Sequence, residues 1–175
     1  MLQLRFTGLT AAAIGAGSLF AGPAAAQTLD LSVEVPRLSV AEYHKPYVAV
    51  WLEKEGATPR TLAVWYDLDM RGNEGTKWLR DMRQWWRASG RSMSFPADGV
   101  SSATKAPGTH RMRFTAGTAP MPRLTPGNYV LHVEAAREVG GRELVRLPFR
   151  WPASGATTVT EQGSSELGAV RLTVR

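Results

Sequence analysis

The chain of 175 residues is long enough for one domain of ordinary size and too short for a large multidomain assembly. Its composition, 43% hydrophobic and 21% charged, supplies enough apolar side chains to bury a core and excludes global disorder. The formal net charge of +6 comes from scattered basic residues, which speaks against a dedicated nucleic-acid-binding arm. The sequence contains no cysteine, so disulfides, thiolate metal sites and thiol nucleophiles are excluded.

The first 26 residues have the organisation of a secretory signal peptide. Arg5 precedes an uncharged apolar stretch from Phe6 to Phe20, and small residues at 24–26 form an A-x-A cleavage site. The alternative is a membrane anchor, but the stretch is interrupted by glycines and is shorter than the roughly 20 apolar residues of a spanning helix. We therefore expect cleavage after Ala26, export to a bacterial periplasm, and a mature domain of residues 27–175 that does not insert into a membrane.

Seven segments of the mature chain have the pattern of β-strands. Apolar and polar residues alternate from 29 to 35, which predicts a strand with one buried face. Continuous apolar runs at 47–52 and 62–66 predict two central strands, joined as a hairpin by the charged turn 53–56. The other predicted strands are 111–114, 129–135, 144–149 and 169–174. Seven short strands at this spacing predict a mainly β fold, an antiparallel sandwich of immunoglobulin or fibronectin type.

Glycine is expected to shape two of the turns between these strands. Gly140 and Gly141 are expected to adopt the positive φ values that a tight hairpin turn requires. In the turn at 125–128, proline presets one dihedral and glycine supplies the next.

Residues 76–89 depart from the strand pattern and predict an inserted amphipathic helix. The apolar residues that fall on one helical face are Trp78, Leu79, Met82, Trp85 and Trp86. Gly90 stands where it can end the helix in the left-handed conformation. We expect the tryptophans to dock the helix on an open face of the sandwich, with one of them available to line a ligand site.

The long segment from 90 to 108 has neither helical nor strand periodicity, and loops of this length are usually functional or disordered. Its residues 98–104, Asp-Gly-Val-Ser-Ser-Ala-Thr, resemble the acceptor sequence of bacterial flavin transferases: an Asp, two residues, Ser or Thr, Gly, Ala, then Thr or Ser. The resemblance implies that FMN is joined through its phosphate to the Thr104 hydroxyl and that the transferase needs Asp98. Ser101 and Ala103 match the motif, whereas Ser102 stands where it prefers glycine. The alternative is an ordinary polar surface loop.

Further residues are candidates to hold such a cofactor. Lys105, Arg111 and Arg113 could balance the phosphate charge, and Trp85, Trp86 or Phe95 could stack on the flavin ring. Residues 154–157, Ser-Gly-Ala-Thr, match the end of the motif but lack its acidic residue, and we expect a turn between the last two strands there.

The sequence lacks the motifs of common enzymes and metal sites. It has no H-E-x-x-H motif, nucleophile elbow, Walker loop or dinucleotide fingerprint. His132 is expected to be an ordinary sheet residue, and a copper or zinc site requires folding to bring His44 and His110 together.

Longer segments resemble DUF2271, a bacterial family of predicted periplasmic proteins. The resemblance rests on residues 37–51, 62–66, 77–86 and 133–143 and spans essentially the whole mature chain. Relatives in this family look associated with extracytosolic flavin-dependent electron transfer, alongside flavin transferases and membrane flavoproteins with PepSY domains. This implies a flavinylated electron carrier whose partners are a flavin transferase and a PepSY-domain membrane reductase. The alternative is a non-catalytic adaptor that binds a protein through the Trp- and Arg-rich segment 76–89.

Overall fold

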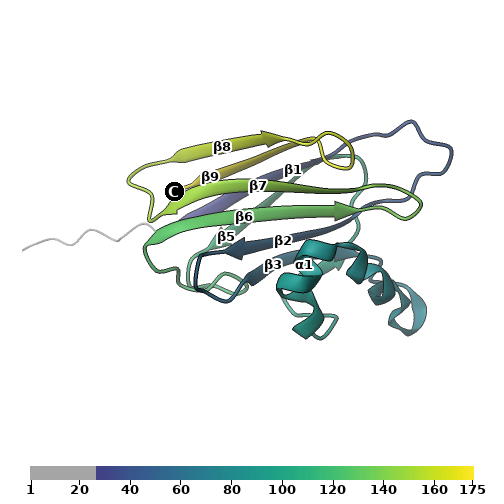
Figure 1. The fold of residues 1–175 in the computed structure, drawn as a ribbon, viewed down its shortest axis with the longest axis horizontal. Helices are drawn as coiled ribbons and strands as arrows, with labels where there is room; N and C mark the ends of the chain where they lie inside the picture. Colours follow the sequence, from purple (N-terminus) through teal and green to yellow (C-terminus); the bar gives the residue numbers. More distant parts are fainter. Residues whose placement is uncertain (1–26) are drawn as a thin grey trace, which may run out of the picture.

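The structure is a computed structural model that describes residues 27–175; the predicted signal peptide, residues 1–26, lies outside the described residues. The described chain forms two packed β-sheets with a helical segment against one of them (Figure 1). The strands are β1 (Thr28–Val35), β2 (Tyr47–Glu53), β3 (Arg60–Tyr66), β4 (Ser101–Ala103), β5 (Gly108–Thr115), β6 (Gly127–Ala136), β7 (Arg142–Trp151), β8 (Thr157–Gln162) and β9 (Ala169–Val174). The helical turns are η1 (Arg71–Asp81), α1 (Arg83–Ala88) and η2 (Gly90–Ser92).

The strand order confirms the predicted β-sandwich. One sheet has the order β5-β1-β9-β8 and the other β4-β3-β2-β6-β7. Neighbouring strands run antiparallel except β3 and β4, which are parallel. The finer type, an immunoglobulin or fibronectin sandwich, stays a prediction.

The main core lies between the two sheets and follows from the alternation predicted in β1. Leu29, Leu31, Val33 and Val35 are buried there, and the residues between them are only partly covered. Burial of this one face supplies the hydrophobic free energy that holds the sheets together.

A second core lies on the outer face of the five-stranded sheet, under the helical turns. Almost every residue of β2 and β3 is buried, because the other sheet covers one face and the helical layer covers the other. The predicted hairpin of these two strands is confirmed by their antiparallel register, in which Val48 faces Trp65. Their continuous apolar sequence is thus the consequence of burial on both faces.

Two strands were not predicted from the sequence. The edge strand β8 is exposed at all but one of its six residues, so it has no apolar alternation to detect. The predicted turn at 154–157 leads from β7 into β8. It therefore does not link the strands that the sequence predicted on either side of it, 144–149 and 169–174. The strand β4 is only three residues long and lies, with η2, in the segment expected to be an irregular loop.

The prediction of one continuous helix over 76–89 is wrong. The chain forms the 3-10 segment η1, breaks at Met82 (φ −77°, ψ 73°), and continues as the short helix α1. The break frees the backbone N–H groups at the start of α1 to reach a different acceptor. Gln84 N and Trp85 N donate to the two carboxylate oxygens of Glu134 on β6, at 3.2 and 2.8 Å.

Glu134 is fully buried and anchors the helical layer to the sheet. Arg142 on the neighbouring strand also donates to it, at 2.9 Å, and neutralises its charge. The Trp85 side chain is fully buried beside it, where its indole N–H donates to Thr61 Oγ1 at 3.0 Å. The tryptophan thus docks the helical layer, as the sequence predicted.

Gly90 has a different role from the predicted left-handed helix cap. It is absent from the residues with positive φ, and it begins η2 directly against the Trp85 ring. A Cβ atom added at Gly90 would lie 2.9 Å from that ring. Glycine is needed there for close approach, not for its backbone conformation.

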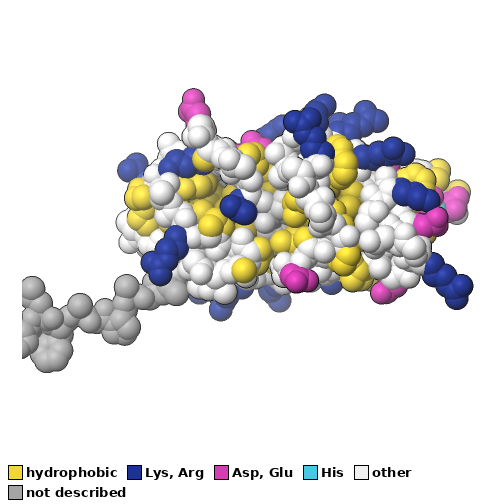
Figure 2. Space-filling model, turned by 90° about the horizontal axis from the view of Figure 1, so that it is seen from below, with side chains coloured by type: hydrophobic (Ala, Val, Ile, Leu, Met, Phe, Trp, Pro, Cys, Tyr) yellow, Lys and Arg dark blue, Asp and Glu magenta, His cyan; other side chains and the backbone are white. Residues whose placement is uncertain are grey.

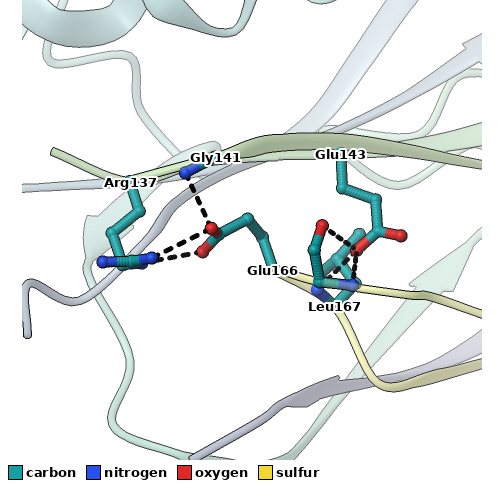
Figure 3. Close-up of polar contacts among 6 residues, drawn as sticks. Arg137, Gly141, Glu143, Glu166 and Leu167 are labelled. Carbon is teal, nitrogen blue, oxygen red and sulfur yellow. Dashed lines mark hydrogen bonds and ion pairs between the residues drawn. The ribbon is translucent and has the colours of Figure 1, made fainter. Parts of the chain in front are cut away.

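The glycines of the β6–β7 hairpin were also misassigned, because the residue with positive φ is Val139 (φ 51°). Gly140 and Gly141 leave room instead for an ion pair, which Figure 3 shows between Arg137 and Glu166 beside Gly141. The Arg137 guanidinium donates to Glu166 at 2.9 and 3.2 Å, and Gly141 N donates to the same carboxylate at 2.8 Å. Both charged side chains are almost completely buried.

A second carboxylate, Glu143, fixes the loop that precedes β9. It accepts bonds from the backbone N–H groups of Ser164, Ser165 and Leu167 and from both serine hydroxyls. Partial burial opposes ionisation of Glu143, but these hydrogen bonds outweigh that effect and lower its pKa below the ordinary value. Together with Arg137 and Glu166, this carboxylate ties the hairpin to the chain before β9.

Replacing Glu134 with Gln should destabilise the protein by about 2 kcal/mol or more, because an amide cannot satisfy three donors and leaves a buried group unpaired. Urea unfolding measures the change. The matched control is Glu161→Gln on exposed β8, which should stay within about 0.5 kcal/mol of the parent. Equal stability of the two variants would contradict the anchoring role of Glu134.

The lowered pKa of Glu143 predicts acid sensitivity. A carboxylate whose pKa is lower in the folded state stabilises the fold above its unfolded pKa, near 4.5, and loses that contribution as the pH falls through the folded value. Glu143→Gln should therefore be less stable than the parent at pH 7 and should show a shallower loss of unfolding free energy below about pH 4.5. An unchanged acid slope would argue against this assignment.

Candidate functional site

The segment that resembles a flavin acceptor begins as an exposed turn and ends as an edge strand. The backbone N–H groups of Val100 and Ser101 donate to Ala97 O, Gly99 has a φ of 69°, and Ser101 Oγ accepts from Ala97 N at 2.9 Å. Asp98 lies exposed at the tip of this turn. An acidic side chain in this position is open to another protein.

The strand β4 places the end of the motif beside β3. Ser101, Ser102 and Ala103 pair with Val64, Trp65 and Tyr66. Ser102 therefore occupies regular strand backbone, and the folded state needs no glycine at this departure from the motif.

Thr104 lies directly after β4, where both its backbone and its side chain are held. Its N–H donates to Tyr66 O at 3.2 Å, and its hydroxyl donates to Asp67 Oδ1 at 3.2 Å. Thr104 is only partly buried, and Asp67 is exposed. The hydroxyl oxygen is therefore oriented by a neighbouring carboxylate while remaining open to solvent.

Thr104 lines a pocket of about 330 Å³, which we call the tyrosine pocket. The β1–β2 connection, the β6–β7 hairpin and η1 meet at the same end of the molecule (Figure 1). Residues from all three line the pocket. The aromatic residues among its lining are Tyr43, Tyr47 and Trp78. Its volume is at the lower end of the range of about 300–1,000 Å³ that is typical of small-molecule sites.

The charges around the tyrosine pocket are mixed, with an acidic excess. Asp67, Asp81 and Glu138 contribute carboxylates, and Lys45 contributes an ammonium. Arg137 also lines the pocket, but its guanidinium is paired with buried Glu166. Such a site disfavours additional negative charge on any ligand that it binds.

Neither tyrosine hydroxyl of the pocket makes a hydrogen bond of normal geometry within the described structure, although the backbone and carboxylate of Asp67 lie near that of Tyr47. Burial raises the pKa of Tyr47 to about 12, and the nearby Asp67 charge adds to the rise. Burial also raises the pKa of Tyr43. Both hydroxyls therefore stay protonated at neutral pH, and a ligand can accept their protons once the neighbouring atoms that cover the two oxygens move aside.

The other predicted site residues do not line the tyrosine pocket with Thr104. Ser101, Lys105 and Arg111 line a second hollow at the open edge of the two sheets. The Lys105 ammonium lies there 5.8 Å from the centre of the Trp65 ring. Arg111 belongs to β5, in the opposite sheet, and Ala103 is exposed on β4.

Trp85 and Trp86 are placed in the second core rather than at the pocket. Trp85 has no exposed surface, so it cannot stack on a ligand in this structure. Trp86 is half-buried and packs edge-on against it, with ring centres 6.1 Å apart. Neither ring lines the tyrosine pocket; the expectation is wrong for Trp85 in this structure, and for half-buried Trp86 it stays a prediction.

The sequence did not single out Tyr43, Tyr47, Asp67 or Trp78 as site residues. Trp78 was assigned to the buried helical face, but its 3-10 backbone leaves it 42% exposed. The apolar pattern of 76–89 did not distinguish Trp78 from its buried neighbour Leu79. The other three lie beyond the motif and are brought near Thr104 by folding.

The three histidines form no metal centre. Among residues 27–175, no group of three or more His, Asp or Glu side chains is arranged to hold a metal ion. His44 lies between Glu42 and Glu138, at 2.9 and 3.5 Å, while His110 contacts Ala106 O at 2.8 Å. His132 lies in β6 as expected and stacks on Trp51, with neither ring nitrogen hydrogen-bonded. Within residues 27–175, no helix is long and apolar enough to cross a membrane.

Comparison with known proteins gives one match. The model of a family described as "Predicted periplasmic protein (DUF2271)" matches residues 28–169, which include the strands β1 to β8 and only the first residue of β9. Neither the curated proteins nor the solved structures give a significant match. Since the match covers well over half of the sequence, this chain belongs to the DUF2271 family of predicted periplasmic proteins.

Proposed function

We propose that this protein is a periplasmic electron carrier with FMN attached covalently to Thr104. The observation that carries the proposal is the position of Thr104: its hydroxyl lies at a pocket, is oriented by Asp67, and follows an exposed acidic turn that another protein can reach. The family description supports the periplasmic location. Removal of residues 1–26 as a signal peptide is part of the proposal.

The attachment requires a flavin transferase and a flavin dinucleotide as donor. The Thr104 oxygen attacks the phosphorus that bears the riboflavin unit, the bond to the AMP oxygen breaks, and AMP leaves. The hydroxyl proton passes to solvent or to the departing phosphate. Asp67 accepts that proton's hydrogen bond beforehand, so it is placed to orient the nucleophile.

Once attached, FMN would supply reversible flavin redox chemistry, which the polypeptide itself lacks. A reduced PepSY-domain membrane flavoprotein would be oxidised as it passes electrons to the carrier, and a downstream acceptor would be reduced in turn. The chain's own residues hold the cofactor and restrict its contact with water.

A second candidate function is docking through the exposed Trp and Arg side chains of η1 and α1. On the face that carries α1, Lys and Arg side chains project outward and hydrophobic side chains lie exposed between them (Figure 2). Trp78 and Arg83 are available for such contacts, whereas buried Trp85 is not. An adaptor of this kind would work without any modification of Thr104.

Co-expression with a flavin transferase should add the mass of FMN minus water to the exported chain. Thr104→Ala should abolish the addition, since no oxygen nucleophile remains at that position. The matched control is Thr157→Ala, in the similar but non-acidic segment 154–157, which should stay fully modified. An unmodified parent chain, or a modified Thr104→Ala chain, would overturn the proposal.

Asp98→Ala should reduce the modification to background without weakening the fold. Asp98 is exposed at the tip of its turn, so the free energy of unfolding should change by no more than about 0.5 kcal/mol. Intact-mass spectrometry and urea unfolding of the same samples separate the two effects. Full modification of Asp98→Ala would show that the acceptor resemblance does not describe how this chain is recognised.

A further inference from the structure

The tyrosine pocket contains a polar group for which the fold provides no partner. Tyr47 is only 7% exposed, its hydroxyl oxygen is buried, and it makes no hydrogen bond of normal geometry, although Asp67 lies near it. The Tyr43 hydroxyl, on the connection that leads into β2, is also buried without a hydrogen bond. Buried polar groups are nearly always hydrogen-bonded, so two unpaired donors in one pocket indicate an acceptor that the chain itself does not supply.

A large aromatic surface forms part of the same pocket. The Trp78 indole is 42% exposed, although other residues of η1 are buried in the helical layer. A planar conjugated ligand would cover this surface and gain stacking contacts. The pocket thus combines an aromatic surface with hydroxyl donors, which fits a flat heteroaromatic ring with carbonyl and ring-nitrogen acceptors.

We infer that the tyrosine pocket seats the isoalloxazine ring of the flavin carried on Thr104, with Trp78 against its face and the hydroxyls of Tyr47 and Tyr43 donating to its polar edge. This inference rests on the proposed function, because Thr104 is the tether. A tether at the pocket wall raises the effective concentration of the ring, so weak contacts suffice to hold it.

The charges of the pocket are compatible with this placement. Esterification removes the hydroxyl proton that Asp67 accepts, and the exposed Asp67 side chain is free to turn into solvent. Lys45 lies on the same pocket and can offset the phosphate charge. Asp81 and Glu138 remain near the ring and oppose negative charge on its reduced form, which lowers its reduction potential relative to free FMN.

The first experiment measures flavin fluorescence of the intact, modified protein, after mass spectrometry has established full attachment in each variant. An indole stacked on the ring quenches this fluorescence, so the parent should be dim and Trp78→Ala should brighten toward free FMN. The matched control is Met70→Ala, whose side chain has a similar exposure of 44% but does not line the pocket. Equal fluorescence of parent and Trp78→Ala would overturn the inference while leaving covalent attachment intact.

The second experiment uses the unmodified protein with riboflavin as the probe, so it does not depend on the transferase. Tyr47→Phe and Trp78→Ala should each raise the Kd for riboflavin about two- to tenfold, the effect of losing one hydrogen bond or one stacked ring. Absence of riboflavin binding by the parent, or unchanged affinity in both variants, would overturn the inference. If riboflavin binds as expected but Thr104 is never modified, the proposed function alone fails.

A stability measurement separates a ligand-binding hydroxyl from a structural one. Tyr47→Phe removes an unpaired buried group, so the unmodified protein should be at least as stable as the parent. The control is Tyr129→Phe, which deletes a hydroxyl that donates to Thr125 O at 2.8 Å and should lower stability. Destabilisation by Tyr47→Phe would show that its hydroxyl already has a structural partner, against the inference.

Discussion

The buried carboxylate of Glu134 is the constraint on which the rest of the structure depends. A single strand residue with no exposure accepts hydrogen bonds from the first turn of α1 and from Arg142 on the next strand. An unpaired charge in this position would be costly, so the helical layer and the sheet must dock together. Because η1 leads directly into α1, this docking also fixes Trp78 at the edge of the tyrosine pocket.

The candidate site combines a scaffold held by hydrogen bonds and an ion pair with side chains that make no such contacts. Backbone pairing with β3 places Thr104, and the ion pair of Arg137 with Glu166 holds the hairpin on the opposite wall. Between them, the hydroxyls of Tyr43 and Tyr47 have no partner, and the indole of Trp78 is exposed. This division is expected of a binding site, where the scaffold satisfies its own polar groups and leaves those that recognise a ligand.

The sandwich could be predicted from the sequence because burial of a strand face requires a periodic pattern of apolar residues. Alternation identified β1, and continuous apolar runs identified β2 and β3, which are covered on both faces. The exposed strand β8 has no such apolar pattern. The strand β4 is too short to have one, and its pairing with β3 is a tertiary contact. The break at Met82 was invisible for the same reason, since its acceptor, Glu134, lies about fifty residues further along the chain.

Only the part of the candidate site that is contiguous in the sequence could be predicted. Asp98 to Thr104 form one contiguous motif, and its exposure as a turn and edge strand could be expected from its small, polar residues. Gly90, Gly140 and Gly141 were recognised as special positions, but close packing requires them rather than positive φ. Tyr43 and Tyr47 come from one segment and Trp78 from another, and only the fold brings them to Thr104.

The central claim is that a flavin nucleotide is bonded to one threonine oxygen. Peptide mapping of the chain exported in the presence of a flavin transferase tests it most directly, because trypsin releases residues 92–105 as one peptide after cleavage at Arg91 and Lys105. The account predicts that fragment ions assign the added FMN to Thr104. Assignment to another hydroxyl of the same peptide, such as Ser101 or Ser102, or recovery of the bare peptide alone, would contradict it.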